Sequence, residues 1–216
     1  MKRLPLVLAM LSVLGLSAPT SIATAAPVYC ALKPTFTVQQ IIWVDGSGSR
    51  QTTRLCAYVS RGRYVLQKGP YAGHVGLNGV AAPGAKREGD GKTPSGAYPM
   101  RGGFGINANP GLASSWRVTD WRDVWVDDPR SRLYNTHQRL PVNGRWASAE
   151  RMRLSPAYNY AQVIGYNEAR IPRRGSAIFL HVDQGRGTAG CVSLPTSSLL
   201  AVMRWQKPGA WIWITQ

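Results

Sequence analysis

Apolar residues along this chain fall mostly in short runs that are separated by glycine-containing turns. Alternating or continuous apolar positions over about four to eight residues, rich in valine, isoleucine, tyrosine and tryptophan, are typical of β-strands. The turn sequences at 45–48 and 61–62 predict a hairpin meander near the start of the domain. The clearest strand-like runs cover residues 39–44, 52–60, 63–67, 160–166, 177–182 and 210–214.

Helical spacing is much rarer. Residues 197–206 repeat apolar side chains at helical spacing, with Thr196 as the expected cap and Pro208-Gly209 as the stop. Residues 147–154 could form a second short helix. Glycine, proline, asparagine and lysine dominate residues 69–111, which favours short strands and loops that line a site. The expected fold is therefore mainly β, with one or two short helices.

The first 25 residues have the composition of a secretory signal peptide. Lys2 and Arg3 precede an apolar run, and the small residues Ala23-Thr24-Ala25 provide a cleavage site. The apolar core is shorter than the ~20 residues needed to span a bilayer. The sequence therefore predicts removal of residues 1–25, a single domain over residues 26–216 without a membrane span, and export to the periplasm or the extracellular cell wall.

The chain is strongly basic, with a formal net charge of +16. Lys2 and Arg3 account for two of these charges and the signal contains no acid, which leaves +14 on the mature chain. A basic exported protein is attracted to anionic surfaces, so an anionic cell wall is the expected partner. The basic residues are scattered rather than gathered in a stripe, and together with export this argues against nucleic acid.

Three cysteines in an exported chain divide most simply into one disulfide and one free thiol. Cys30 and Cys56 lie close together in the sequence, whereas Cys191 lies alone far downstream. We therefore expect a Cys30–Cys56 bridge and a free Cys191. The alternative is that all three are buried, small apolar residues.

His181 and Cys191 form the strongest candidate for chemistry. An apolar strand leads to His181, and a glycine-rich loop leads on to Cys191. A neighbouring imidazole can take the proton of a thiol and form the nucleophilic thiolate. Thr188, Ala189 and Gly190 are small, so backbone N–H groups there could stabilise a substrate oxyanion. Thr188 could instead bond His181 or close the turn, and Gly190 could serve an unusual backbone angle or a close approach.

Three parts of the chain resemble the L,D-transpeptidase catalytic domain, the YkuD-like family. In that family a histidine precedes a Ser/Thr-x-Gly-Cys segment, which reads Thr188-Ala189-Gly190-Cys191 here. Residues 87–99 contain Gly-Asp-Gly-Lys-Thr-Pro-Ser-Gly, similar to the family's Gly-Asp-x-x-Thr-Pro-x-Gly segment. Ala189 stands where most members have histidine, and His181 lies closer to Cys191 than is usual. Residues 125–129, 134–135 and 175–181 resemble a subgroup of the family.

This resemblance implies an L,D-transpeptidase-like β-sandwich that acts on peptidoglycan stem peptides. Cys191 would form a thioester after the third stem residue and release a D-amino acid, with His181 as base and then acid. An amine from a neighbouring stem would complete a cross-link, whereas water would make the enzyme an L,D-carboxypeptidase. Arg186 could bind a stem carboxylate, with ordinary surface charge as the equal alternative. No metal or organic cofactor is implied.

The remaining histidines and Asp183 have weaker claims. His74 favours a structural or surface role, His137 lies in a polar stretch typical of solvated side chains, and Asp183 is more typical of a solvent-facing loop carboxylate than of a group that orients His181. Two rival classes stay open. A zinc peptidase could use His181, Asp183 and another histidine, and a non-catalytic wall-binding protein would need only charge and aromatic side chains.

Overall fold

The computed structural model describes residues 26–216, so the predicted signal peptide lies outside the described residues. The predicted mainly β class is confirmed. The part of the chain described contains one α-helix, α1 (Thr196–Trp205), and one 3-10 turn, η1 (Ala157–Asn159). Neither is long and apolar enough to cross a membrane. The strands are β1 (Gln40–Ser47), β2 (Arg50–Ser60), β3 (Arg63–His74), β4 (Val80–Ala81), β5 (Thr93–Pro94), β6 (Gly96–Gly105), β7 (Trp116–Val118), β8 (Asp123–Val126), β9 (Thr136–Arg139), β10 (Ala149–Arg151), β11 (Ala161–Ile164), β12 (Phe179–Val182), β13 (Val192–Leu194) and β14 (Trp211–Thr215).

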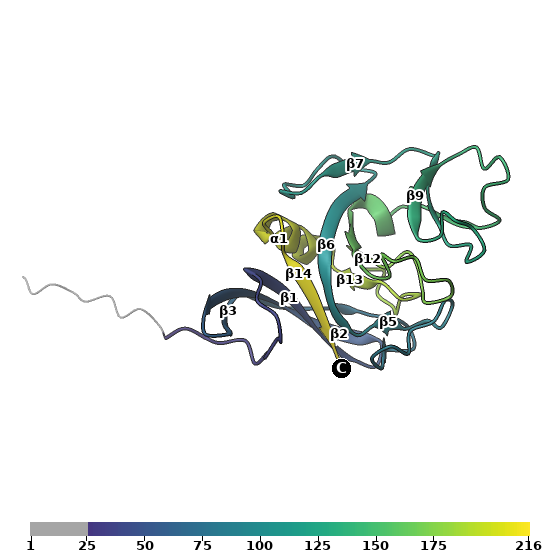
Figure 1. Cartoon of the computed structure of the whole chain (residues 1–216). Coiled ribbons are helices and arrows are strands. Elements are labelled where there is room, and N and C mark those ends of the chain that lie inside the picture. The colour runs from purple at the N-terminus through teal and green to yellow at the C-terminus, as the bar shows by residue number, and fades with distance from the viewer. Residues whose placement is uncertain (1–25) are drawn as a thin grey trace, which may run out of the picture.

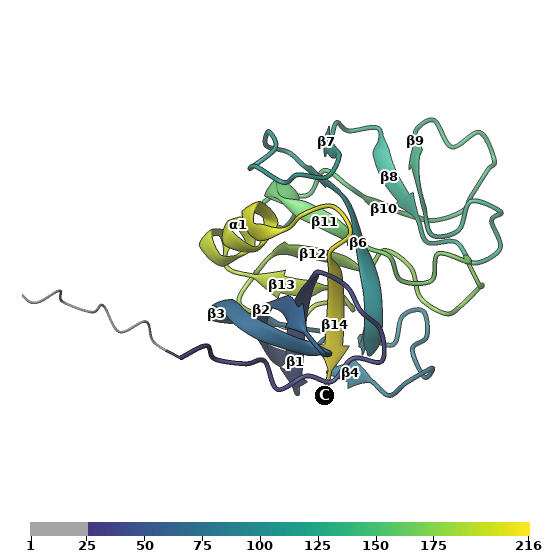
Figure 2. The same cartoon turned by 60° about the vertical axis from the view of Figure 1, so that its left-hand side comes forward.

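The main sheet closes on itself. Its order is β11-β12-β13-β3-β2-β1-β14-β6-β7, and β6 also pairs with β11, so all but β7 belong to a closed ring. The two halves of the ring face each other across one core, as expected for the predicted sandwich-like fold (Figure 1). Strands β8, β9 and β10 form a separate small sheet at one end of the molecule (Figure 2).

Side chains alternate along β12 between two different surroundings. Leu180 and Val182 enter the main core, whereas Phe179 belongs to a second cluster that includes Cys191. A strand places successive side chains on opposite faces, so one strand can serve both the core and a site. The buried strand predicted at residues 177–182 therefore also determines which side chains face the cavity described below.

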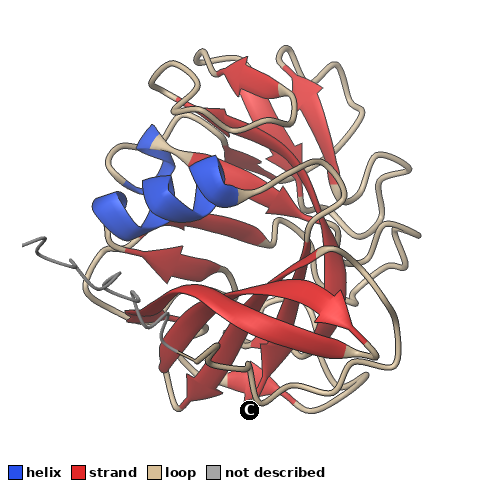
Figure 3. Cartoon of the chain, turned by 90° about the vertical axis from the view of Figure 1, so that its left-hand side faces the viewer, coloured by secondary structure: helices blue, strands red, loops and turns tan. Residues whose placement is uncertain are grey.

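Helix α1 covers one side of the curved sheet (Figure 3). The helix begins at Thr196 and ends at Trp205, within one residue of the prediction at each end. Thr196 is not the cap, because Pro195 occupies that position and no side chain caps the helix. Packing of one apolar face stabilises the helix instead, through Leu199, Val202 and Met203.

The helix expected at residues 147–154 is wrong. Residues 149–151 form β10, which pairs antiparallel with β8 through Ala149 opposite Val126 and Arg151 opposite Val124. Pairing with a distant strand satisfies more of the backbone N–H and C=O hydrogen bonds here than a short helix would. The strand predicted at 63–67 is also too short, since β3 continues past Gly69, where a φ of 95° and a nearby shift in register with β2 accommodate the bend.

The segment before β1 covers the outer face of the first hairpin. Cys30 is bonded to Cys56 of β2, with an S–S distance of 2.01 Å. Both sulfurs lie in an apolar cluster with Ile41, Tyr64 and flanking aromatic side chains. The disulfide therefore ties this covering segment to the closed sheet.

A network of charges anchors the small sheet at Asp123. The Asp123 carboxylate is fully buried and accepts hydrogen bonds from Arg117 (2.8 Å), His137 (2.7 Å) and Arg139 (3.1 Å). His137 is thus a structural partner rather than a solvated side chain. Burial alone would raise the pKa of Asp123, but the bonds from Arg117, the Asp120 backbone and His137 outweigh it and lower the pKa to about 2.

We expect this network to make the protein sensitive to acid. A carboxylate with a depressed pKa stabilises the fold above its unfolded pKa of about 3.9, and the stabilisation is lost as the pH falls toward the folded value. Between pH 4 and pH 2 the free energy of unfolding should fall by about 1 to 2 kcal/mol from this group, after allowance for screening at the exposed arginines. Urea unfolding across this range checks this loss, and Asp123→Asn should flatten the dependence. An unchanged slope in the variant would contradict this role.

Candidate active site

Parallel pairing of β12 with β13 brings His181 and Cys191 to one face of the sheet. His181 lies opposite Ser193, and Cys191, just before β13, lies beside Phe179 and shares its apolar cluster. Phe179 and His181 are two residues apart on one strand, so their side chains point to the same face. The two residues predicted as a catalytic pair therefore lie on the same side of adjacent strands.

Both side chains line a cavity of about 450 Å³. The four residues predicted to bind substrate also line it: Arg186, Thr188, Ala189 and Gly190. Cys30 and Cys56 lie in a different cluster, away from this cavity. The opposite wall comes from parts of the chain that are distant in sequence, namely Lys86, Glu88, Asp127, Glu150 and Tyr158.

The Cys191 thiol is buried and held by backbone groups. The Phe179 N–H donates to Sγ at 3.3 Å, and Sγ donates to the Ala177 carbonyl at 3.3 Å. Ala177 has a φ of 52°, a strained angle for a residue with a side chain. Burial, with a smaller contribution from the charge of Glu150, raises the pKa of the Cys191 thiol to about 12. The resting thiol is therefore neutral, and a thiolate would form there only if a base removed its proton.

His181 has the tautomer and protonation state of a base. Its Nδ1 lies 2.9 Å from the Val182 carbonyl, which can only accept, so Nδ1 carries the proton and Nε2 has the free lone pair. Burial lowers the pKa of His181 below its ordinary value, which keeps the imidazole neutral at pH 7. The Tyr158 ring packs edge-on against the imidazole, with 5.5 Å between ring centres, and restricts its orientation.

The loop before Cys191 is fixed by two threonine hydroxyls. Thr188 donates to the Cys191 carbonyl at 2.7 Å and accepts from the Gly190 N–H at 3.1 Å, so it closes the turn and does not bond His181. Thr93 donates to the same carbonyl at 3.0 Å. Gly190 has a φ of 152°, and a Cβ there would lie 3.0 Å from the Lys92 carbonyl, so both backbone angle and space require glycine.

Asp183 does not orient His181, and the expectation that it faces solvent is wrong. Its carboxylate accepts hydrogen bonds from Ser193 at 2.7 Å and pairs with His74 Nδ1 at 2.8 Å, with 12% of the side chain exposed. Strand β12 ends at Val182, so the alternation that would align Asp183 with His181 stops one residue too early. His74 therefore has a structural partner and does not line the cavity.

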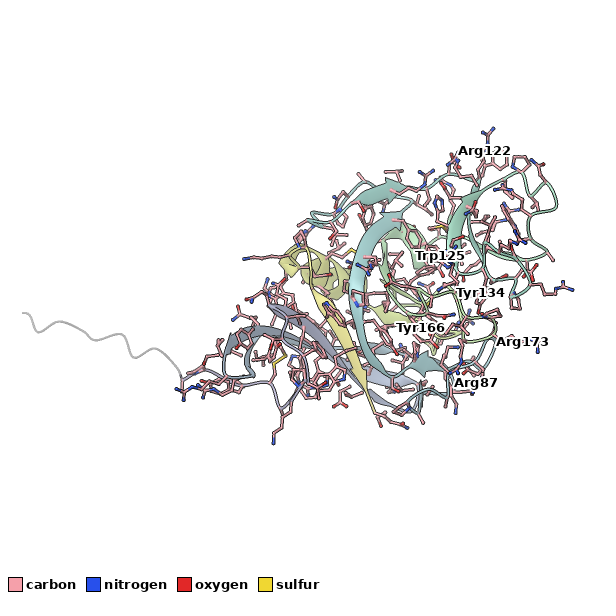
Figure 4. The ribbon with its side chains drawn as sticks, in the orientation of Figure 1. Arg87, Arg122, Trp125, Tyr134, Tyr166 and Arg173 are labelled. Carbon is pink, nitrogen blue, oxygen red and sulfur yellow. A yellow bond between two sulfur atoms is a disulfide. The ribbon has the colours of Figure 1, made fainter. Side chains whose placement is uncertain are left out.

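A second, larger cavity of about 630 Å³ lies beside the small sheet and is lined in part by Trp125, which packs edge-on against Phe179 with 5.1 Å between ring centres. Trp125 belongs to β8 of the small sheet, and Tyr134 and Tyr166 lie below it on loops (Figure 4). Asn135 joins them, because its Oδ1 accepts from Trp125 Nε1 at 2.8 Å and from the Ala177 N–H at 3.1 Å, while its amide donates to the Tyr166 carbonyl at 3.0 Å. The strained Ala177 beside the thiol is thus held by Asn135, which directly precedes β9 of the small sheet.

Sequence reasoning missed Glu150 and Tyr158 and gave no role to Thr93. Thr93 lies inside the Gly-Asp-x-x-Thr-Pro-x-Gly segment, which is the signal that could have identified it. Tyr158 in η1 donates a hydrogen bond to Glu150 in β10. Neither residue belongs to a segment with a recognisable pattern, and only the pairing of β10 with β8 brings Glu150 to the cavity.

Comparison with known proteins identifies the family of this chain. The family model of the L,D-transpeptidase catalytic domain (YkuD) matches residues 39–214, so the chain belongs to that family. Among solved structures, the helical cell shape determining protein Pgp2 from Campylobacter jejuni is similar at 15% identity and a TM-score of 0.40, with 82% of this chain and 48% of that chain covered. A mutant of Pgp2 gives 16% identity, a TM-score of 0.40 and coverage of 82% and 47%. The chain thus spans about half the length of Pgp2. No curated protein sequence matches it.

Proposed function

We propose that this protein is an exported L,D-transpeptidase, in which Cys191 forms a thioester with a peptidoglycan stem peptide and passes the acyl group to an amine. The observation that carries the proposal is that a buried thiol and a neutral imidazole face one cavity from adjacent parallel strands. The family match supports the reaction class. The Cys30–Cys56 disulfide and the net charge of +16 support export and association with an anionic wall.

Acylation would use both side chains in turn. His181 Nε2 takes the thiol proton as Sγ attacks the carbonyl carbon of the stem bond, and a C–S bond forms. The C–N bond then breaks, and the imidazolium returns the proton to the departing amine. Cys191 is left as a thioester and His181 as a neutral imidazole. The fixed Cys191 carbonyl keeps the sulfur in place throughout, since two hydroxyls bind it.

Intact-mass measurement after incubation with a tetrapeptide stem or a carbapenem tests the proposal. We expect an adduct on one residue, mapped to Cys191, and no adduct in Cys191→Ala. Binding to isolated cell wall should be equal in both proteins, because charge and not the thiol drives it. Wall binding without any adduct in the wild-type protein would contradict an acyl-enzyme and favour a non-catalytic wall-binding protein.

Product identity distinguishes the two reactions open to the thioester. Release of a tripeptide alone would identify an L,D-carboxypeptidase, and a cross-linked dimer would identify a transpeptidase. The further inference below bears on this choice, because it concerns how an amine enters the cavity.

A further inference from the structure

The acidic residues of this chain are distributed unevenly around the cavity. The chain has 10 acidic residues against 26 lysines and arginines. Seven of the ten form ion pairs with basic side chains or histidines of residues 26–216. The three that form no such pair in this part of the chain all line the cavity of Cys191: Glu88, Asp127 and Glu150.

These three carboxylates differ in their remaining capacity to bind a ligand. Glu88 accepts two hydrogen bonds at the same oxygen, Oε2, from Tyr134 and from Ser176 (2.8 Å), which hold it against the cavity wall more firmly than the other two. Glu150 accepts one hydrogen bond from Tyr158 through Oε1, which leaves Oε2 for a ligand. Asp127 Oδ1 is buried and has no hydrogen-bond partner among the described residues. A buried carboxylate oxygen without a partner is costly, and a cationic group in the cavity would remove that cost.

Glu150 also lies near enough to the Cys191 sulfur for its charge to affect the thiol. Its charge contributes to the raised pKa of Cys191, and the charge of Asp127 in turn raises the pKa of Glu150, although burial is the main cause in both cases. The pKa of Glu150 reaches about 7, so its carboxylate can both hold and release a proton near neutral pH.

We propose that Asp127 and Glu150 form the binding site for the acceptor amine, with Glu150 as the base that deprotonates its ammonium group. This inference rests on the proposed function, because it concerns the second half of the same reaction. The ligand class is a primary alkylammonium. An ammonium has three N–H donors and no lone pair, so it can bind both carboxylates and cannot attack a thioester until it loses a proton.

The proton balance of the transfer step is complete with these groups. Glu150 takes one proton from the ammonium, and the free amine nitrogen attacks the thioester carbon. A C–N bond forms and the C–S bond breaks, so the electron pair returns to Sγ. His181 takes the second proton from nitrogen and passes it to Sγ, which restores the thiol. Glu150 then releases its proton to water.

This assignment is tested by measuring how fast a preformed thioester on Cys191 is transferred to two different acceptors. The protein is acylated with a tetrapeptide stem, and an acceptor is then added: either a peptide with a side-chain primary amine or hydroxylamine, which is uncharged at neutral pH. In Glu150→Gln we expect transfer to the ammonium acceptor to fall about 100-fold. Both acceptors meet the same preformed thioester, so the readout is the ratio of the two transfer rates, and transfer to hydroxylamine should fall much less than transfer to the ammonium acceptor. Asp127→Asn should raise the amine concentration needed for half-maximal transfer, with a smaller effect on the maximal rate.

Glu168→Gln is the matched control, because Glu168 is an exposed acid paired with Arg101 outside this cavity. Its transfer to both acceptors should equal that of wild type. Equal losses for both acceptors in Glu150→Gln would overturn the acceptor site and indicate a role in donor binding or folding. Absence of any thioester in the wild-type protein would instead overturn the proposed function on which this assignment rests.

Discussion

Replacement of His181 by asparagine should lower the rate of Cys191 acylation about 1,000-fold at pH 7. With a thiol pKa of about 12, only about one molecule in 100,000 carries a thiolate at neutral pH, so the reaction depends on removal of the proton during attack. His181 is the histidine that lines the cavity, and its free Nε2 is suited to that task. Stopped-flow or quenched mass measurement of adduct formation checks the rate.

The pH dependence of the acylation rate distinguishes loss of a base from loss of the folded structure. In His181→Asn the rate should rise about tenfold per pH unit from neutral pH toward 11, because hydroxide then supplies the thiolate. The wild-type rate should instead stay level down to the lowered pKa of His181 and fall only below it, as the imidazole becomes protonated. His74→Asn is the control, because His74 pairs with Asp183 away from the cavity, and it should retain the wild-type profile. A flat, low rate in His181→Asn at every pH would contradict the role as base.

Removal of the Cys30–Cys56 disulfide should lower the free energy of unfolding by about 3 kcal/mol. The bond closes a loop with a sequence separation of 26 and therefore restricts the unfolded chain. Guanidinium unfolding of the Cys30→Ala, Cys56→Ala double variant measures this effect against wild type. Acylation of Cys191 in the folded variant should be unchanged, since the two sulfurs lie in a separate apolar cluster.

Two further measurements test whether the loss of stability comes from the disulfide. Wild-type protein under reducing conditions should lose a similar amount, whereas Cys191→Ala should retain the disulfide contribution. A loss below about 1 kcal/mol in the double variant would mean that the covering segment before β1 is held by its apolar contacts alone.

Much of the part of the candidate site around His181 and Cys191 could be predicted from sequence because it is local. An apolar strand, a glycine-rich loop and a following strand fix His181 and Cys191 within a short stretch, and parallel pairing of β12 with β13 aligns them. Local sequence patterns also predicted the helix at residues 197–206, found at Thr196–Trp205, and the first hairpin. The resemblance to the L,D-transpeptidase family added Thr93 as part of a segment, without its contact to the Cys191 carbonyl.

The acidic half of the site could not be predicted because it depends on long-range pairing. Glu150 belongs to a three-residue strand that resembles a helix in sequence, and its neighbour in the cavity, Asp127, follows a strand of the same small sheet. The expectation for Asp183 was wrong for the opposite reason. Asp183 is close to His181 in sequence, but strand β12 ends at Val182 and the Asp183 carboxylate pairs with His74. The sequence shows that these residues are acidic but not which residues they contact. Those contacts depend on how the sheets pair and close.

The neutral state of Cys191 has a consequence for how the chain matures. Thiol–disulfide exchange proceeds through a thiolate, and a buried sulfur with a pKa of about 12 supplies almost none. Once β12 and β13 have paired, burial of Cys191 disfavours the thiolate that exchange with the Cys30–Cys56 bond would require. Under the proposed function, the fold would keep the Cys191 thiol unreactive until a substrate and His181 act on it together.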